Sequence, residues 1–257
     1  MRISLIQDTI IWANKESNLA NLEMQLSTLS GKTDLVVLPE MFSTGFCTDQ
    51  PQLAEDMQGK TISYLKTFAK KFNTAIVGSF IASDNGLLFN RAFFVFPDGR
   101  TEHADKRHLF SVGGENKHFA SGNKKLIVNY CGFNISLLVC YDIRFPVWSR
   151  NIKNEYDLLI YVANFPENRI NNWDILLQAR AIENQCYVCG VNRIGSDELG
   201  INYNGHSVLL DYLAKPIVEC TEGAAEIKTA SIDKNKLINF REKAPYWKDA
   251  DTFEVKK

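Results

Sequence analysis

Four apolar runs along this chain each end in a polar residue, and this pattern constrains the fold more than any other feature of the sequence. The runs DLVVL, ISLLV, DLLIYVA and YVCGV lead to Glu40, Cys140, Asn164 and Asn192-Arg193, respectively. A short apolar run without polar alternation is typical of a strand buried on both faces. In open α/β sheets, ligands bind at the edge where the carboxyl ends of such strands meet. The pattern therefore predicts buried sheets with a functional site at one edge.

Helix-like segments alternate with these runs. Apolar residues at helical spacing predict helices over residues 16–29, 61–72 and 172–185. Asp233 is suited to cap a last helix, because its carboxylate can accept hydrogen bonds from the first free backbone N–H groups. The chain is thus expected to contain helices and strands in alternation.

Hairpin signals separate several further strands. The turn sequence P-D-G-R lies between predicted strands at 91–96 and 101–104, and a Cys-Gly pair lies between KLIVNY and ISLLV. Other predicted strands cover TAIVGSF, HSVLL, KPIVE and AEIKTASI. Because runs buried on both faces are mixed with hairpins, we expect an α/β fold of two packed mixed sheets with helices outside them.

The sequence shows no repeat, linker or low-complexity tract, so one domain over residues 1–257 is the simplest division. The net charge of −1 argues against nucleic-acid or anionic membrane partners. The start, MRISLIQ, lacks the regions of a signal peptide, and no run approaches the roughly 18 apolar residues of a membrane span. We therefore expect a cytoplasmic protein.

Cys186 and Cys189 form a C-Y-V-C tetrapeptide, which is a spacing found in redox and zinc sites. No second ligand pair has a comparable spacing, and the tetrapeptide starts an apolar run instead of a helix. We expect both cysteines to be small buried core residues. The sequence therefore predicts neither a metal site nor a disulfide framework among its six cysteines.

Cys140 is the candidate nucleophile, because charged residues follow it directly in the sequence Tyr141-Asp142-Ile143-Arg144. A cysteine reacts as the thiolate, so a nearby base or cation must favour that form. On the turn after the strand, the backbone N–H of Tyr141 could donate to an oxyanion. A cysteine at the end of an apolar run is also a common core residue, and the local sequence leaves both interpretations open.

Glu40 is the candidate general base, because it directly follows DLVVLP and is held at a strand end. The chain has four histidines, but none of the local signatures of a papain-like Cys–His pair is present. A glutamate that simply faces solvent after a strand is the alternative interpretation. The residue type and position therefore suit a base without proving one.

Lys106 and Glu115 are two further candidates. Lys106 lies in D-K-R-H-L-F, and a cation near the thiolate would stabilise it and later hold the oxyanion of a tetrahedral intermediate. Glu115, in a Gly-Gly-Glu loop, could orient this lysine or activate water. A solvated loop is the alternative interpretation for the lysine. Spacing alone cannot show that residues so far apart in the sequence meet.

Three motifs in order, L-P-E-M-F, D-K-R-H-L-F and L-V-C-Y-D-I-R-F-P, resemble the nitrilase (carbon–nitrogen hydrolase) superfamily over nearly the whole chain. The resemblance implies a four-layer αββα sandwich that usually dimerises by extending its sheets, and it implies no cofactor. It implies a catalytic triad of Glu40 as general base, Lys106 as stabiliser of the oxyanion and thiolate, and Cys140 as nucleophile. Glu115 matches the second glutamate of the family, here in G-E-N-K-H-F-A-S-G.

Within this superfamily, C-Y-D-I-R-F-P-V-W-S-R, Y-V-A-N-F-P, A-R-A-I-E-N-Q and the ending Y-W-K-D-A-D are similar to the bacterial omega-amidases. That branch hydrolyses the terminal amide of 2-oxoglutaramate and 2-oxosuccinamate to a 2-oxo acid and ammonia. True nitrilases typically follow the cysteine with Trp-Glu, whereas this chain has Tyr141-Asp142. The resemblance therefore implies a cysteine amidohydrolase that acts on a small linear carboxamide through a thioester.

Such a substrate carries a distal carboxylate, which needs a cationic partner. Arg144 is the nearest candidate in the sequence, and a buried Arg144 paired with Asp142 or Glu183 is the alternative. Tyr141 is a further candidate for contact with the substrate. Three aromatic residues are candidates to wall a small pocket or, alternatively, to pack in the core: Phe42, Phe165 and Trp173.

Other functions stay open at this point. Another small-molecule amidase or an N-carbamoyl hydrolase of the same superfamily is one alternative, and a catalytically silent binding protein is another. A metal-dependent phosphodiesterase also uses an αββα sandwich with a strand-end glutamate, but it would want a terminal Asp-His pair. The sequence Gly-His-Ser at 205–207 lacks that aspartate, and Cys140 would be idle.

Overall fold

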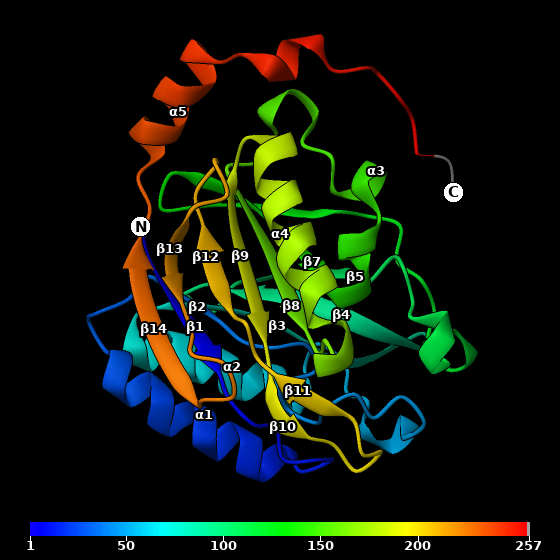
Figure 1. Cartoon of the computed structure of the whole chain (residues 1–257). Coiled ribbons are helices and arrows are strands. Elements are labelled where there is room, and N and C mark those ends of the chain that lie inside the picture. Colours follow the sequence, from blue (N-terminus) through cyan, green and yellow to red (C-terminus); the bar gives the residue numbers. More distant parts are fainter. Residues whose placement is uncertain (256–257) are drawn as a thin grey trace.

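The computed structural model describes residues 1–255 and contains two mixed six-stranded sheets packed face to face (Figure 1). The last two residues of the predicted domain lie outside the described part. The first sheet has the order β14 (Glu226–Ser231), β1 (Arg2–Gln7), β2 (Leu35–Val37), β3 (Ala75–Asp84), β4 (Leu87–Val95) and β5 (Thr101–Asp105). The second has the order β13 (Pro216–Glu219), β12 (Val208–Leu210), β9 (Tyr187–Asn192), β8 (Leu158–Ala163), β7 (Phe133–Val139) and β6 (Leu126–Tyr130).

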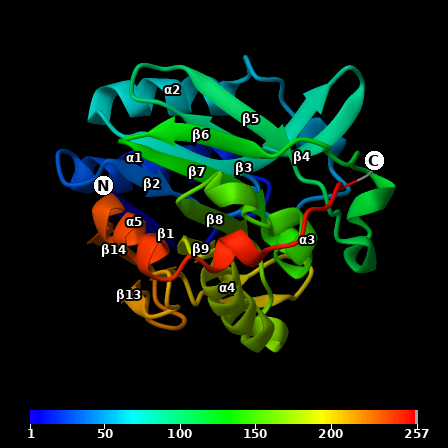
Figure 2. The same cartoon turned by 90° about the horizontal axis from the view of Figure 1, so that it is seen from above.

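Helices cover the outer face of each sheet, as Figure 2 shows from above. The first sheet packs against α1 (Lys15–Leu29) and α2 (Lys60–Phe72), and the second packs against α3 (Pro146–Ser149) and α4 (Ile170–Asn184). Short 3₁₀ helices lie in the connections: η1 (Pro51–Leu53), η2 (Ser111–Gly113), η3 (Glu115–Lys117), η4 (Cys140–Arg144), η5 (Ile152–Asn154), η6 (Glu167–Arg169) and η7 (Tyr246–Asp249). The α/β fold of two packed sheets between helical layers is thereby confirmed.

The strand β2 explains why the central runs are apolar without alternation. Leu35 and Val37 point into the core between the two sheets, whereas Val36 points into the core beneath α1 and α2. All three side chains are fully buried. A strand with an apolar layer on each side has no polar face, so its sequence reads as a continuous run. The strands β7, β8 and β9 sit in the same setting in the second sheet and pair in parallel.

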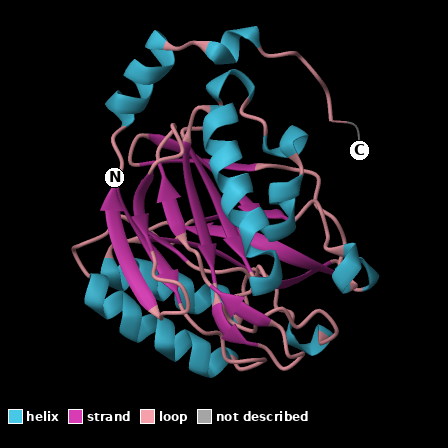
Figure 3. Cartoon of the chain, in the orientation of Figure 1, coloured by secondary structure: helices cyan, strands magenta, loops and turns pink. Residues whose placement is uncertain are grey.

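The predicted helices are confirmed, with starts one or two residues earlier than the apolar spacing indicated. Asp233 caps α5 (Lys234–Lys243), since its carboxylate accepts hydrogen bonds from the backbone N–H groups of Asn235 and Lys236. Figure 3 shows the helices outside the strands of the two sheets. The predicted alternation holds only in part, because β9 to β14 follow one another without a helix between them. Among the described helices, none combines the length and apolar character needed to cross a membrane.

The predicted strands 74–80 and 91–96 were too short, because β3 and β4 form one long hairpin from residue 75 to residue 95. Asn85 and Gly86 make its turn, and both have a positive φ, +49° and +77°. An Asn-Gly pair is suited to this backbone, because both residue types tolerate the left-handed region. A small hairpin of β10 (Ile194–Ser196) and β11 (Asn202–Asn204) was also not predicted.

The C-Y-V-C tetrapeptide is part of the core, as predicted. Cys186 lies in the core beneath α4, whereas Cys189 lies in the core between the sheets. The two side chains therefore face opposite sides of the second sheet. Burial raises the pKa of both thiols. This arrangement separates the two sulfur atoms and disfavours their reactive thiolate forms.

The helix α5 is attached to the second sheet by a buried ion pair. Arg241 donates from Nη1 to Asp157 Oδ1 at 3.0 Å, and its other nitrogens donate to the carbonyls of Gln185 and Tyr156. Both charged side chains are less than 10% exposed (8% and 5%). Lys234, at the start of the same helix, also contacts Asp157. The last helix is therefore held by charges that water does not screen.

Replacing Arg241 with leucine is expected to lower the free energy of unfolding by about 3 kcal/mol, because Asp157 keeps its buried charge and loses a partner. Urea unfolding followed by circular dichroism measures this change. Arg100→Leu is the matched control, because its pair with Asp98 is exposed and should contribute little. Equal unfolding midpoints for the two variants would contradict this account of how α5 is held.

Candidate active site

Three of the four predicted strand ends meet between the two sheets. Glu40 follows β2 of the first sheet, while Cys140 and Asn164 follow β7 and β8 of the second. The backbone N–H of Asn164 donates to Glu40 Oε2 at 2.9 Å, and its side-chain amide donates to the Glu40 carbonyl at 2.8 Å. Residues 124 positions apart are thus joined by direct hydrogen bonds, and the site lies at the carboxyl ends of strands from both sheets.

The fourth strand end, at Asn192 and Arg193, supports the residues of this site without lining it. Asn192 accepts a hydrogen bond from the backbone N–H of Phe165 at 2.7 Å and so fixes the residue after Asn164. Arg193 points elsewhere, with its guanidinium over the ring of Tyr203 at 4.7 Å and a hydrogen bond to the carbonyl of Ile10. The strand-end pattern therefore located the site but did not distinguish the residues that line it from those that support it.

Lys106 is the centre of a buried ion network. Its ammonium group lies 2.9 Å from Glu40 Oε1 and 2.9 Å and 3.1 Å from the two oxygens of Glu115. All three side chains are fully buried. Burial by itself lowers the pKa of Lys106, but the negative charges of Glu115 and Glu40 outweigh it and hold that pKa above its ordinary value. The lysine is therefore a permanent cation at neutral pH.

Asn90, in β4, is a member of this network that sequence reasoning missed. Its side-chain amide donates to Glu40 Oε1 at 2.7 Å and to Glu115 Oε1 at 3.0 Å. The residue is fully buried. The available signal was an asparagine inside the mainly apolar strand LFNRAFFVF, since a buried amide needs partners.

Cys140 sits on a strained turn at the start of η4. Its φ is +44°, in the left-handed region that costs a residue with a side chain roughly 1 kcal/mol or more. Asp142 holds the turn: its carboxylate accepts hydrogen bonds from the backbone N–H groups of Val139 and His108. The strain is compensated by these contacts, and the thiol is presented at the end of the strand.

The Cys140 thiol is protonated at neutral pH in the free protein. Burial raises the pKa of the thiol well above its ordinary range, and the charges of Glu40 and Glu115 raise it further. The ammonium of Lys106 acts in the opposite direction without reversing the shift. The thiol also contacts the Glu40 carboxylate. A thiol in this form needs a base to take its proton before it can attack, and the Glu40 carboxylate is in contact with it.

A cavity of about 100 Å³ opens at Cys140. Lys106, Asn164, Tyr141 and Phe165 line it beside the thiol, as does the aromatic ring of Phe46. Residues of η2 and of the β10–β11 hairpin complete its walls. The volume suits a small molecule of a few carbon atoms.

Two arginines lie on this cavity. Arg144 is exposed and Arg169 is half-buried, with its guanidinium 4.9 Å from the ring centre of Phe110. Within residues 1–255, neither forms an ion pair with a carboxylate. The alternative of a buried Arg144 paired with Asp142 or Glu183 is wrong, since those acids contact His108 and Arg180. Arg169 was not predicted, because only the folded chain brings η6 to the cavity.

Two aromatic candidates do not line the cavity. Phe42 packs in the core between the first sheet and its helices, with its ring 5.9 Å from that of Phe93. Trp173, in α4, is fully buried and packs against Phe165 at a ring distance of 5.4 Å. For both residues, the alternative of core packing describes their position.

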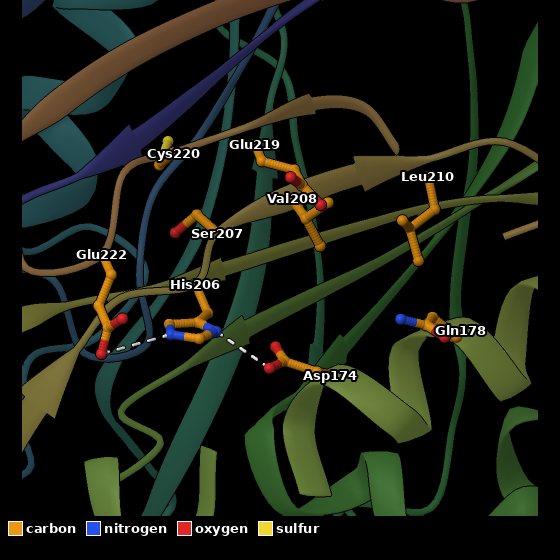
Figure 4. Close-up of a pocket in the computed structure, with 9 residues that line it drawn as sticks. All are labelled: Asp174, Gln178, His206, Ser207, Val208, Leu210, Glu219, Cys220 and Glu222. Carbon is orange, nitrogen blue, oxygen red and sulfur yellow. Dashed lines mark hydrogen bonds and ion pairs between the residues drawn. The ribbon is translucent and has the colours of Figure 1, made fainter. Parts of the chain in front are cut away.

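A second cavity, of about 340 Å³, lies beside α4 and β12 (Figure 4). His206 lies there between two carboxylates, 3.0 Å from Asp174 and 3.7 Å from Glu222. Cys220 also lines it, and burial raises the pKa of that thiol to about 11, which disfavours a Cys–His nucleophile. Across residues 1–255, no three His, Cys, Asp or Glu side chains are grouped to hold a metal ion. His206, the histidine of Gly-His-Ser, is therefore placed neither for a Cys–His nucleophile nor for a metal site.

Comparison with known proteins identifies close relatives along the full chain. The sequence is 40% identical to the omega-amidase YafV of Escherichia coli K12 over 257 residues, covering 99% of this chain and 98% of that protein. It is 32% identical to the 2-oxoglutaramate amidase of Bacillus subtilis, with 96% of each chain covered. These relatives support an omega-amidase or a related amidase of the nitrilase superfamily.

A solved structure has the same fold. XC1258 from Xanthomonas campestris, described as a CN-hydrolase superfamily protein with an arsenic adduct in its active site, matches with a TM-score of 0.97. It is 38% identical and covers 100% of this chain and 99% of its own. The agreement confirms the four-layer arrangement of sheets and helices.

The family model described as carbon-nitrogen hydrolase matches residues 2–242, a span that contains Glu40, Asn90, Lys106, Glu115 and Cys140. The chain therefore belongs to the carbon–nitrogen hydrolase family, within the nitrilase superfamily, and is an amidohydrolase.

Proposed function

We propose that this chain is an omega-amidase, which hydrolyses the terminal carboxamide of 2-oxoglutaramate or 2-oxosuccinamate to the 2-oxo acid and ammonia. The observation that carries this proposal is Cys140 in contact with the buried Glu40–Lys106 pair at a small cavity, on which two arginines lie that have no acidic partner within residues 1–255. The first group suits amide chemistry, and the arginines suit an acid at the other end of the substrate. Relatives named omega-amidase and 2-oxoglutaramate amidase support the same substrate class.

In the first half of the proposed reaction, Glu40 takes the thiol proton as the Cys140 sulfur attacks the amide carbon. The raised pKa of Cys140 supports this coupling, because the free thiol is protonated at neutral pH. Lys106 and the backbone N–H of Tyr141 hold the oxyanion, and each such donor is worth about 3 kcal/mol. Glu40 then gives the proton to the departing nitrogen, which leaves as ammonia, and a thioester stays on Cys140.

In the second half, water attacks the thioester carbon, and the tetrahedral intermediate expels the Cys140 sulfur to give the 2-oxo acid. Glu40 or Glu115 accepts the proton of this water, and the thiol is re-formed. Both carboxylates contact Lys106, which supports their action on the same face of the site. No step requires a cofactor.

Arg144 and Arg169 are proposed to bind the distal carboxylate of the substrate. A guanidinium matches a carboxylate through paired hydrogen bonds, and both groups lack an acidic partner within residues 1–255. The aromatic ring of Phe110 supports the Arg169 guanidinium by a cation–π contact. The alternative of another small-molecule amidase is favoured by one observation: Phe46, Phe110 and Phe165 give much of the wall an apolar character.

We also propose that the chain is one catalytic domain and functions as a cytoplasmic homodimer. The core between the sheets draws residues from both of them, which supports a single folding unit. Ile175 and Ile182 are 56% and 58% exposed and lie seven residues apart on α4, hence on one helical face. Light scattering on the eluting protein should give twice the chain mass of 29.2 kDa, and a monomer mass would contradict the dimer.

The wild-type protein is expected to release ammonia from 2-oxoglutaramate faster than from glutamine, an aliphatic amide or a nitrile. Cys140→Ala should abolish this activity, and Glu40→Gln should reduce kcat by about 10³-fold, because the thiol then lacks its base. A coupled ammonia assay measures both. Cys189→Ala is the matched control, since this buried cysteine lies outside the site and should keep full activity. Comparable turnover of the nitrile would rule out the omega-amidase assignment.

Replacing Arg144 or Arg169 with methionine is expected to raise KM for 2-oxoglutaramate about 10- to 100-fold, the value of a lost charged hydrogen bond. The same variants should leave kcat/KM for a neutral aliphatic amide within about threefold, because that substrate has no carboxylate to bind. Steady-state kinetics on both substrates test this difference. Equal losses of kcat/KM on the two substrates would show that the arginines do not bind the carboxylate.

A further inference from the structure

We infer that Asn90 is a positioning residue that keeps Glu40 and Glu115 in working geometry while Lys106 turns toward the substrate. The inference rests on the proposed roles of Cys140, Glu40 and Lys106. It concerns a side chain that neither attacks nor donates to the substrate. Asn90 is in β4 and does not line the cavity at Cys140.

Asn90 contacts all three residues of the network, the two glutamates through their carboxylates and the lysine through its backbone. The two hydrogens of its amide are divided between the carboxylates, with Nδ2 at 2.7 Å from Glu40 Oε1 and 3.0 Å from Glu115 Oε1. Its backbone carbonyl accepts a hydrogen bond from the backbone N–H of Lys106 at 2.9 Å. An amide of asparagine has only two N–H donors, so both are committed to these acids.

The hydrogen bonds of Lys106 explain why a second donor is needed. An ammonium group has three hydrogens, and three carboxylate oxygens lie within reach: one on Glu40 and two on Glu115. A lysine that stabilises an oxyanion must turn one hydrogen away from this set. Two of the three oxygens, Glu40 Oε1 and Glu115 Oε1, are also bonded to Asn90. Either oxygen therefore stays satisfied when Lys106 releases it.

The amide itself, and not its volume, is what this position uses. Asn90 is fully buried, and its Oδ1 has no hydrogen-bond partner within the described chain. A buried polar side chain with an unsatisfied oxygen is unfavourable at a site where packing alone matters. Its neighbour in the register is the apolar Ile81 of β3. The donors to Glu40 and Glu115 are the gain that offsets this penalty.

The charged groups that act on the Cys140 thiol are Glu40, Lys106 and Glu115, and Arg144 and Arg169 line the cavity in front of it. Asp142, in the same turn, pairs with the imidazole of His108. Loss of the Asn90 donors leaves the two glutamates less well compensated. The negative field of their charges at the thiol therefore becomes stronger.

The experiment compares Asn90→Ser and Asn90→Asp with Asn184→Ser, a matched control. Asn184 is similarly buried (3% exposed) and hydrogen-bonded, but it lies in α4 and contacts Asn151. Both Asn90 variants should lose about 10- to 100-fold in kcat, with KM changed less than about threefold. The acidic limb of the kcat/KM profile should move up by about one pH unit, the shift expected from a lost hydrogen bond to a charged group. The control should keep the wild-type profile.

A second readout does not depend on the substrate. Iodoacetamide modification of Cys140, followed by peptide mass spectrometry across pH 7–11, should become slower in Asn90→Ser and shift to higher pH. The Asp variant preserves the shape of the side chain. If one of the two variants fails to fold, the other therefore still tests the inference. If both variants keep the wild-type pH profiles and differ from wild type only in thermal stability, the result expected of Asn184→Ser, the inference is wrong. If wild-type protein hydrolyses no 2-oxo acid amide but the alkylation shift is present, the substrate proposal fails and the inference stands.

Discussion

The ion network of Glu40, Lys106 and Glu115 is the interaction on which the site depends. Burying an isolated charge is prohibitive, so each member of this network is tolerable only because the others are present. Lys106 lies within 3.1 Å of both acids, and Asn90 in the neighbouring strand β4 donates hydrogen bonds to the same two acids. The network therefore requires β2 to β5 of the first sheet to be paired before it can form.

The second sheet adds Cys140, the proposed nucleophile, and links the network to it. Asn164 donates to Glu40 across the interface between the sheets, and Cys140 meets the same carboxylate from the neighbouring strand. The apolar layer between the sheets holds these strand ends at a constant separation. Packing of the core and geometry of the site are thus two aspects of one arrangement.

Much of this arrangement could be predicted from the sequence, because its strongest signals are local. Runs such as DLVVL identify strands buried on both faces, and the polar residue that ends each run marks the edge where a site forms. Asn90 and Arg169 could not be found in this way, since each reaches the site through the fold. Phe42 and Trp173 were candidates for the pocket wall but pack in the core instead. The sequence cannot separate the two positions, because an aromatic residue near a motif can face the core as readily as the cavity. The long hairpin of β3 and β4, in contrast, has a local signal in its turn residues Asn85 and Gly86.

The order of the site residues along the chain has a consequence for synthesis of the protein. A nascent chain that has emerged as far as residue 115 carries the base, the lysine and the second glutamate, but no Cys140. Asn164, which ties Glu40 to the second sheet, is made later still. The reactive centre is therefore absent until both sheets exist and have docked. A chain that ends before Cys140 therefore lacks the thiol that the proposed reaction needs to cleave an amide.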